Sequence, residues 1–176
     1  MQYKRLFILI EGDDDEKIFQ RIIKPIFEKK YDHVMLWKYA QEKDDKIFKF
    51  IKSIESMDAD YICVADINGS PCVTDRKQRL HKDIKNIEKE KIVVVKKEIE
   101  SWYLSGLNET SSKKLKVKSF VNTEHITKKQ FNDLIPKIFD SRIDFMSEIL
   151  KFFCMNTAKM KNESFKYFIE KFECGI

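Results

Sequence analysis

At 176 residues, the chain has the length of one domain, or of one domain with a small appendage, and is long enough to bury a hydrophobic core. Its net charge of +5 is compatible with an anionic partner, but a lysine-rich composition alone would produce the same excess. No apolar stretch reaches transmembrane length and the N-terminus lacks the layout of a signal peptide, so we expect a cytoplasmic protein with no membrane segment.

The first predicted element is a strand formed by the apolar residues 6–10, which ends abruptly at Glu11. Gly12 permits a tight turn before an amphipathic helical pattern over residues 18–27. Three acids lie in that turn: Asp13, Asp14 and Asp15. Helix capping alone would explain the first two. Glu11 needs a partner because it closes a buried strand, and a cation is the natural one. Ligands of open α/β sheets bind beyond the carboxyl ends of strands, so Glu11 marks a candidate site.

Three further strand patterns alternate with helical patterns. Strands are predicted over residues 34–39, 61–65 and 91–95, and helices over residues 44–54 and 74–89. This alternation favours a four-stranded, mostly parallel sheet with helices on both faces. The third strand is followed by Asp66 and a run of turn-forming residues. The third helix carries Arg76 and Lys77 on a face that we predict to contact phosphates, although a solvated helix face has the same pattern.

Beyond residue 106 the alternation ends. Residues 107–125 are polar, which predicts a mobile basic excursion with four candidate nucleic-acid contacts: Lys113, Lys114, Lys116 and Lys118. Helical patterns close the chain over residues 127–135, 145–153 and 165–172, and Pro136 interrupts the first. Their phenylalanine stripes are typical of core packing. We therefore expect an α/β domain over residues 1–106 and a helical extension over residues 107–176 packed on the same body.

The acids that follow the strands are predicted to share one site. Glu11, Asp66 and either Glu98 or Glu100 come after three different strands. The carboxyl ends of parallel strands lie at the same edge of a sheet, so these side chains are expected to converge there. Oxygen ligands of this kind suit a hard divalent cation, above all Mg²⁺ or Mn²⁺.

Several other kinds of site are excluded by what the sequence lacks. It contains no Walker loop, GxGxxG fingerprint or Ser/His/Asp order, which argues against P-loop enzymes, dinucleotide oxidoreductases and serine hydrolases. The histidines are isolated from one another: His33, His81 and His125. The cysteines lack the paired CxxC spacing of a zinc knuckle and do not suggest a disulfide scaffold: Cys63, Cys72, Cys154 and Cys174.

Three segments resemble motifs of TOPRIM domains, the metal-binding fold shared by topoisomerases, bacterial primases and several nucleases. LIEGDDDEKIF, at residues 9–19, resembles the first motif, and VADINGS, at residues 64–70, resembles the second. EIESWYL, at residues 98–104, resembles a Glu-x-Glu-x-Trp segment of the overcoming-lysogenization-defect nucleases and their small stand-alone relatives. The resemblance covers about residues 6–104.

The resemblance implies a set of metal ligands. Glu11 and Asp66 would hold the principal ion, and four other residues would complete one or two sites: Asp15, Asn68, Glu98 and Glu100. Lys96 or Lys97 would neutralise charge on the scissile phosphate. The family usually has an aspartate where this chain has Asn68, so a second metal should bind more weakly. Asp15 and Glu100 are candidates to compensate; alternatively, the site binds its ligands without turnover.

The function implied is phosphodiester cleavage in DNA or RNA that depends on Mg²⁺ or Mn²⁺, within a defence or repair system. A partner ATPase or assembly into a homo-oligomer would fit that resemblance. The length leaves no room for the tyrosine-bearing domain and gate of a topoisomerase. Two alternatives remain: a non-catalytic regulatory module that binds metal and nucleic acid, and a phosphotransfer enzyme acting on a small nucleotide.

Overall fold

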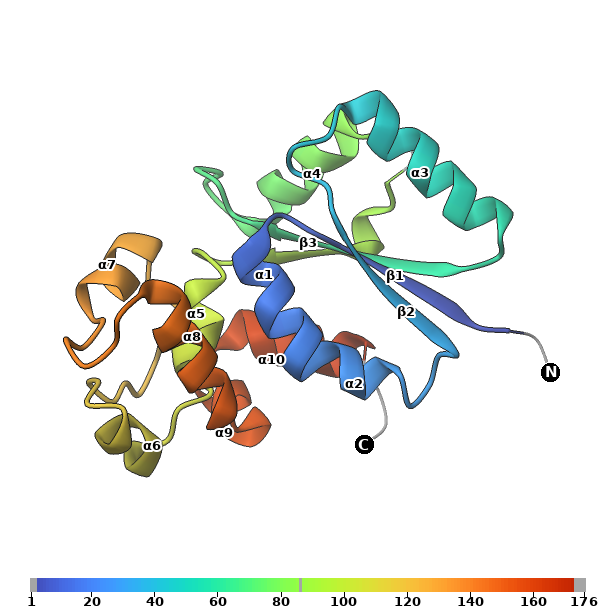
Figure 1. Ribbon diagram of the computed structural model, residues 1–176. Coiled ribbons are helices and arrows are strands. Elements are labelled where there is room, and N and C mark those ends of the chain that lie inside the picture. The colour runs from blue at the N-terminus through green and yellow to red at the C-terminus, as the bar shows by residue number, and fades with distance from the viewer. Residues whose placement is uncertain (1–2, 86, 173–176) are drawn as a thin grey trace. The chain divides into compact units, whose positions relative to one another are not determined.

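The computed structural model describes residues 3–85 and 87–172, and it divides the chain into two compact units (Figure 1). The first unit ends at Val95 and the second begins at Lys96. Cys63, Cys72 and Cys154 are free thiols, whereas Cys174 lies outside the described residues. Within the described ranges, no helix has both the length and the apolar character that a membrane crossing requires.

The first unit is built on a four-stranded parallel sheet, which confirms the predicted α/β fold. Its strands are β1 (Arg5–Ile10), β2 (His33–Lys38), β3 (Asp60–Asp66) and β4 (Ile92–Val95), in the order β2-β1-β3-β4. All three pairings are parallel, so the four carboxyl ends lie at one edge of the sheet. The apolar residues of β1 are buried, as expected for a central strand covered on both faces.

Helices cover both faces of this sheet (Figure 1). One face is covered by α1 (Asp13–Ile18), the π-helical segment η1 (Phe19–Ile23) and α2 (Lys24–Phe27). The other face is covered by α3 (Asp44–Ser56) and α4 (Val73–Asp83). A short 3₁₀ segment, η2 (Lys89–Lys91), leads into β4. On the α3 and α4 side, Phe7 and Leu9 of β1 join one buried cluster with Ile51 and Leu80. Each such side chain contributes about 1.5 to 3 kcal/mol through its removal from water.

The third predicted helix was too long. The pattern placed it over residues 74–89, but α4 ends at Asp83 and Ile84 has an extended backbone, with φ −102° and ψ 100°. Ile84 and Ile87 still enter the core from the segment beyond the helix. These two residues have helical spacing but reach the core from a segment that is not a helix. Periodicity alone does not distinguish such a segment from the last turn of a helix.

The second unit is helical. Its helices are α5 (Glu100–Ser105), α6 (Glu109–Lys114), α7 (Lys128–Asp133), α8 (Arg142–Lys151), α9 (Met155–Lys161) and α10 (Glu163–Phe172). The ring of Trp102 meets those of Phe165 and Phe168 at centroid distances of 5.1 and 5.4 Å, which confirms that the phenylalanine stripes form core. Helix α9 was not predicted because its sequence, MNTAKMK, lacks an apolar stripe.

The predicted excursion over residues 107–125 contains the short helix α6. Asn108 caps α6 by accepting the N–H of Ser111 at 2.8 Å, and both Leu115 and Val117 are buried. Short polar residues had suggested a loop, but here they cap and pack a helix. The four lysines of this segment are nevertheless all exposed: Lys113, Lys114, Lys116 and Lys118.

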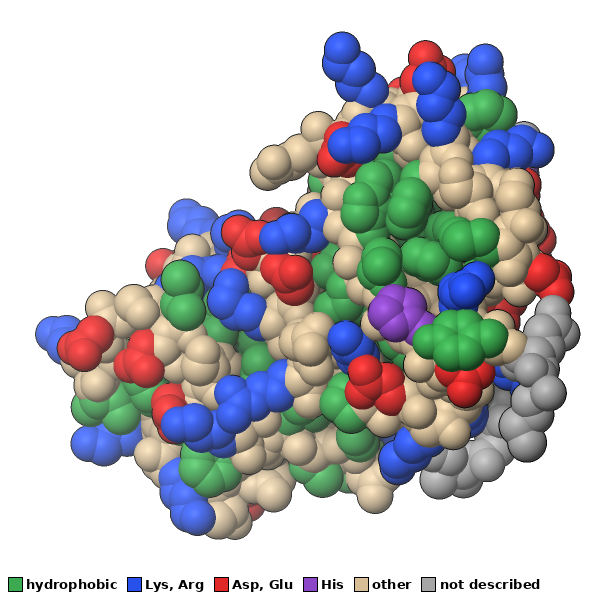
Figure 2. Space-filling model, turned by 45° about the vertical axis from the view of Figure 1, so that its right-hand side comes forward, with side chains coloured by type: hydrophobic (Ala, Val, Ile, Leu, Met, Phe, Trp, Pro, Cys, Tyr) green, Lys and Arg blue, Asp and Glu red, His purple; other side chains and the backbone are tan. Residues whose placement is uncertain are grey.

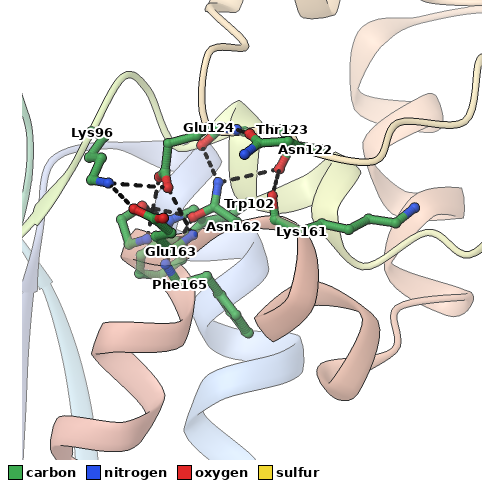
Figure 3. Close-up of polar contacts among 11 residues, drawn as sticks. Lys96, Trp102, Asn122, Thr123, Glu124, Lys161, Asn162, Glu163 and Phe165 are labelled. Carbon is green, nitrogen blue, oxygen red and sulfur yellow. Dashed lines mark hydrogen bonds and ion pairs between the residues drawn. The ribbon is translucent and has the colours of Figure 1, made fainter.

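A buried polar network stabilises the second unit around Asn162 (Figure 3). Its Nδ2 group donates to the hydroxyls of Ser101 and Thr123 at 3.2 and 3.3 Å. Its Oδ1 atom accepts the hydroxyl of Ser164 at 2.8 Å and the N–H of Phe165 at 2.9 Å. Asn162 therefore caps α10 and ties its start to two other segments, with each polar atom used twice.

Glu124 completes the cap of α10 (Figure 3). Its carboxylate accepts the N–H groups of Glu163 and Ser164 at 2.8 and 3.3 Å, which suits the positive end of a helix. Lys96 pairs with both Glu124 and Glu163, and the hydrogen bond to Glu163 is the main reason that the pKa of Lys96 is raised. Trp102 joins the network by donating its Nε1–H to Ser164 at 3.0 Å.

Replacing Asn162 with alanine should therefore destabilise the protein. Asn162→Ala removes a helix cap and leaves the buried N–H of Phe165 unsatisfied, which should lower the free energy of unfolding by about 2 to 3 kcal/mol. Urea unfolding followed by circular dichroism measures this loss. The matched control is Asn156→Ala at an exposed position of α9, expected to change stability by less than about 0.5 kcal/mol. Equal effects of the two changes would show that the network contributes nothing.

Candidate functional site

The carboxyl ends of β1 and β3 carry the side chains of the candidate site in the first unit. Glu11 directly follows β1, Asp66 is the last residue of β3, and Asn68 lies two residues further on. Because β1 and β3 are adjacent and parallel, the sheet brings these three positions together at one edge. The backbone makes a tight turn there, with Asn68 and Gly69 at φ values of 43° and 71°. Asparagine tolerates this left-handed conformation and glycine favours it.

Three hydrogen-bond donors surround the carboxylate of Glu11. Arg76 Nη2 lies 3.2 Å from Oε1 and forms an ion pair with it. Asn68 Nδ2 lies 3.2 Å from the same oxygen and 3.5 Å from Oε2. The hydroxyl of Tyr39 lies 3.4 Å from Oε1. The side chains of Glu11 and Arg76 are only 18% and 14% exposed, so this charge pair is largely shielded from water.

Arg76 links the ends of two strands. Its Nε donates to the backbone carbonyl of Asp66 at 2.8 Å, while Nη2 reaches Glu11. The start of α4 positions it: Cys72 Sγ accepts the N–H of Asp75 at 3.5 Å, and the carbonyl of Cys72 accepts the N–H of Arg76 at 3.1 Å. The sequence predicts that Arg76 and Lys77 contact phosphates, and this role stays a prediction. The structure adds that Arg76 reaches Glu11, because this position of α4 lies over the end of β3.

Tyr39 is a site residue that the sequence analysis missed. It follows β2 directly, its backbone N–H donates to the carbonyl of Ile10 at 2.9 Å, and its side chain is buried. Burial raises the pKa of Tyr39 well above its usual value, and Cys63 and Glu11 nearby add to the shift. The phenol therefore stays protonated and serves as a donor to Glu11. Its position after a strand was the available signal, as it was for Glu11.

The three aspartates of the turn after Glu11 have different surroundings. Asp15 is buried, and its Oδ2 accepts the N–H of Gly12 at 3.1 Å, which caps the start of α1. Asp13 is exposed and pairs with Lys38 at 2.8 Å, and this hydrogen bond lowers the pKa of Asp13. Asp14 lies 3.9 Å from Lys17. Helix capping and surface ion pairs account for these contacts, and Asp15 remains a predicted ligand.

Four predicted site residues belong to the second unit. Glu100 is buried and pairs with Arg142 at 2.5 Å, and Glu98 accepts the N–H of Lys128 at the start of α7. Lys96 is engaged by two glutamates, whereas Lys97 is exposed. Glu98 and Glu100 therefore each have a hydrogen-bond donor within the second unit. Their participation in the site stays a prediction.

The chemistry of the donor set fits a hard cation, but its arrangement does not yet present three ligands. Glu11, Asp66 and Asn68 offer the carboxylate and amide oxygens that Mg²⁺ and Mn²⁺ prefer. Among the described residues, however, no group of three or more His, Cys, Asp or Glu side chains is placed to hold a metal. Asn68 turns its amide nitrogen toward Glu11, and Arg76 supplies a positive charge there. A bound cation would require Arg76 to withdraw and Asn68 to present Oδ1.

Comparisons with known proteins yielded distant structural neighbours only. No protein-family model and no curated protein sequence matches the chain. The C-terminal region of the Burkholderia pseudomallei OLD protein has 13% identity and a TM-score of 0.49, over 93% of this chain and 96% of that one. The C-terminal region of the Xanthomonas campestris pv. campestris OLD protein has 13% identity and a TM-score of 0.42, over 96% and 97%. The fold class is established by the parallel sheet described above.

The ion pair between Glu11 and Arg76 should contribute measurably to stability. In a double-mutant cycle with Glu11→Gln and Arg76→Gln, we expect a coupling of about 1 to 2 kcal/mol, because the pair is mostly buried and hydrogen-bonded. Urea unfolding of the four proteins gives this value. The pair of Asp75 and Arg79, at 2.7 Å on the same helix but with exposures of 34% and 54%, is the control, expected below about 1 kcal/mol. Equal couplings would contradict the expected effect of burial.

Proposed function

We propose that this protein is a divalent-metal-dependent nuclease that hydrolyses phosphodiester bonds in DNA or RNA. The observation that carries the proposal is the cluster at one sheet edge, where Glu11 contacts the guanidinium of Arg76 and the amide of Asn68, and Arg76 also binds the backbone carbonyl of Asp66. Acidic ligands for a hard cation, next to a cation suited to phosphate, are the groups that phosphoryl chemistry requires. The TOPRIM-like motifs at residues 9–19 and 64–70 provide Glu11, Asp66 and Asn68, whereas Arg76 lies beyond them in α4.

Each residue has a defined part in this proposal. Glu11 and Asp66 would hold the principal metal ion, and Asn68 would add a neutral oxygen. Further ligands would come from Asp15, Glu98 and Glu100. A bound Mg²⁺ or Mn²⁺ supplies an activated water and stabilises charge on the phosphate. Arg76, with Lys96 or Lys97, would bind the phosphate and neutralise its charge. Tyr39 keeps the Glu11 carboxylate in place through its protonated hydroxyl.

A second candidate function is a non-catalytic regulatory module that binds metal and nucleic acid. The contacts of Glu11 favour it, because Arg76, Asn68 and Tyr39 all donate to this carboxylate. An acid that is already neutralised in this way has less need of a metal ion. Asn68 also favours the regulatory module. It stands where the resembling family usually has an aspartate, so one charge that would attract a second cation is missing.

Cleavage assays with ligand variants test the nuclease proposal. Mn²⁺ or Mg²⁺ should raise the melting temperature, because an ion that binds the folded protein stabilises it, and should support cleavage of plasmid or single-stranded substrates. Glu11→Gln should remove most of that shift. Asp66→Ala should reduce cleavage by about 100-fold or more, since loss of groups that merely support metal ligands already costs about 10- to 100-fold.

The matched control is Asp60→Ala, at the opposite end of the same strand, which should retain cleavage. Cleavage that persists in Asp66→Ala would place the activity elsewhere in the chain or in a contaminant. A folded protein that cleaves neither DNA nor RNA with either ion, with its cellular partners added, would favour the regulatory module.

The exposed lysines of residues 113–118 are the proposed nucleic-acid contacts. On the face in Figure 2, Lys and Arg side chains lie among Asp and Glu side chains, so that face carries no unbroken basic patch. A local group of four exposed lysines is therefore a sharper candidate than the net charge: Lys113, Lys114, Lys116 and Lys118. Lys113 also pairs with Glu109 at 2.8 Å, and this exposed contact is weak enough to exchange for a phosphate.

Replacing these four lysines with glutamine should flatten the salt dependence of binding. Each phosphate contact contributes about 0.7 (single strand) to 0.9 (duplex) to the slope of log K against log salt, so the slope should fall by roughly 3. Fluorescence anisotropy with a labelled oligonucleotide measures it. Glutamines at four exposed positions near or on α3 form a control with the same change of charge: Lys43, Lys46, Lys49 and Lys52. Equal slopes in the two variants would mean that the 113–118 lysines make no specific contact.

A further inference from the structure

We infer that Arg76 is an exchangeable counter-ion of Glu11, which holds this carboxylate while no divalent cation is bound and releases it to the cation in order to bind phosphate. The inference rests on the proposed function and adds a regulatory step to the same site. It makes Arg76 a substrate-binding residue that couples the occupancy of the metal site to the presence of an anionic substrate.

Competition for one oxygen atom is the first part of the argument. Oε1 of Glu11 lies 3.2 Å from Arg76 Nη2, 3.2 Å from Asn68 Nδ2 and 3.4 Å from the Tyr39 hydroxyl. A divalent cation bound to this oxygen would meet a guanidinium at close range in a shielded site, where charges of equal sign repel strongly. The two cations therefore exclude each other at Glu11.

The geometry of Arg76 also allows it to leave. Its Nε is bonded to the carbonyl of Asp66, which belongs to the backbone and remains in place when the carboxylate of Glu11 turns to a metal. Nη2 can then move while Nε stays anchored. The planar guanidinium has five N–H donors in a fork that matches two phosphate oxygens, so a phosphate can replace the contact that Glu11 gives up.

Neighbouring residues of α4 show that this arrangement is specific to one position. Arg79 pairs with Asp75 of its own helix at 2.7 Å and is 54% exposed. Helix α4 therefore directs one arginine to the end of the sheet and another to solvent. Because both carry the same charge on the same helix, Arg79 serves as the internal reference for Arg76.

The exchange predicts reciprocal coupling between metal and phosphate. A cation at Glu11 frees Arg76 for a phosphate, and a phosphate that holds Arg76 frees Glu11 for a cation. Each ligand should therefore raise the affinity for the other by the same factor. Such coupling would keep the metal site weak until nucleic acid is present.

Titration of the full chain with Mn²⁺ alone tests the competition. Isothermal calorimetry should show that Arg76→Gln binds Mn²⁺ about tenfold more tightly than the unaltered protein, or better, within the usual range of coupling between sites. Arg79→Gln removes the same charge but should tighten binding by about threefold at most, because exposed charges are screened. Arg76→Lys, which keeps the charge, should have an affinity between those of the unaltered protein and Arg76→Gln. Equal tightening by Arg76→Gln and Arg79→Gln would overturn the inference.

The movement of Arg76 has a direct spectroscopic test. In ¹⁵N-labelled protein, the Nη–H signals of Arg76 should shift when Mg²⁺ is added, because Nη2 leaves Glu11 while Nε stays on the carbonyl of Asp66. The guanidinium N–H signals of Arg79, whose Nε pairs with Asp75 at 2.7 Å, should not change and serve as the internal control. An unchanged Arg76 signal in protein that has bound Mg²⁺ would also overturn the inference. This measurement needs no variant and so avoids any effect of substitution on folding.

These experiments separate the inference from the nuclease proposal. If Arg76→Gln tightens Mn²⁺ binding but the unaltered protein does not cleave nucleic acid, counter-ion exchange holds and the nuclease proposal fails. If the unaltered protein cleaves but Arg76→Gln binds Mn²⁺ no more tightly, the nuclease proposal holds and counter-ion exchange fails. If neither the unaltered protein nor Arg76→Gln binds Mn²⁺, both fail.

Discussion

The parallel pairing of β1 with β3 is the constraint on which the candidate site depends. Its register runs from Leu6 opposite Asp60 to Leu9 opposite Cys63, so both strands point the same way at the centre of the sheet. Glu11 and Asp66 can lie at one edge only because of this direction; an antiparallel β3 would carry Asp66 to the far edge. The turn beyond Asp66 then leads into α4, which returns Arg76 to the strand ends.

In each unit, an acid that is shielded from water is paired with a guanidinium. Glu11 is paired with Arg76 in the first unit, and Glu100 is paired with Arg142 in the second. An isolated buried carboxylate is costly, and an arginine offsets that cost through several directed hydrogen bonds. The pairs differ in exposure, because the side chain of Glu100 is 3% exposed whereas that of Glu11 is 18% exposed. Glu11 is therefore the acid that remains more accessible to a ligand from solvent.

The lysine-rich segment at residues 113–118 alternates buried apolar side chains with exposed lysines. Leu115 and Val117 are buried, while Lys116 lies between them and is exposed. Lys116 has a φ of 56°, a left-handed conformation that ends α6 and turns the chain. A structured segment that presents lysines loses less conformational entropy on binding a phosphate chain than a mobile loop would. The helical part of this segment would therefore bind a phosphate chain at a smaller entropic cost than the predicted mobile loop.

The sequence by itself determined the sheet and the positions of the acids. Apolar runs with β-branched residues mark buried strands, and the alternation of strands and helices requires parallel pairing, so the placement of Glu11 and Asp66 at one edge follows from local pattern. The core role of the phenylalanine stripes is equally local, because helical spacing determines which side chains share a face. These features need no knowledge of distant contacts.

Only the tertiary structure decided which partners the site residues have. Arg76 lies 65 positions from Glu11 in the sequence and Tyr39 lies 28 positions from it, and no local pattern relates them. A solvated helix face and one that carries an arginine to a buried acid look alike in sequence, so the contact of Arg76 was not predicted. The polar residues at the start of α6 misled for the same reason, because Ser and Asn suit both loops and helix starts. Packing chose between these outcomes, since a buried polar group must find a partner wherever the fold supplies one.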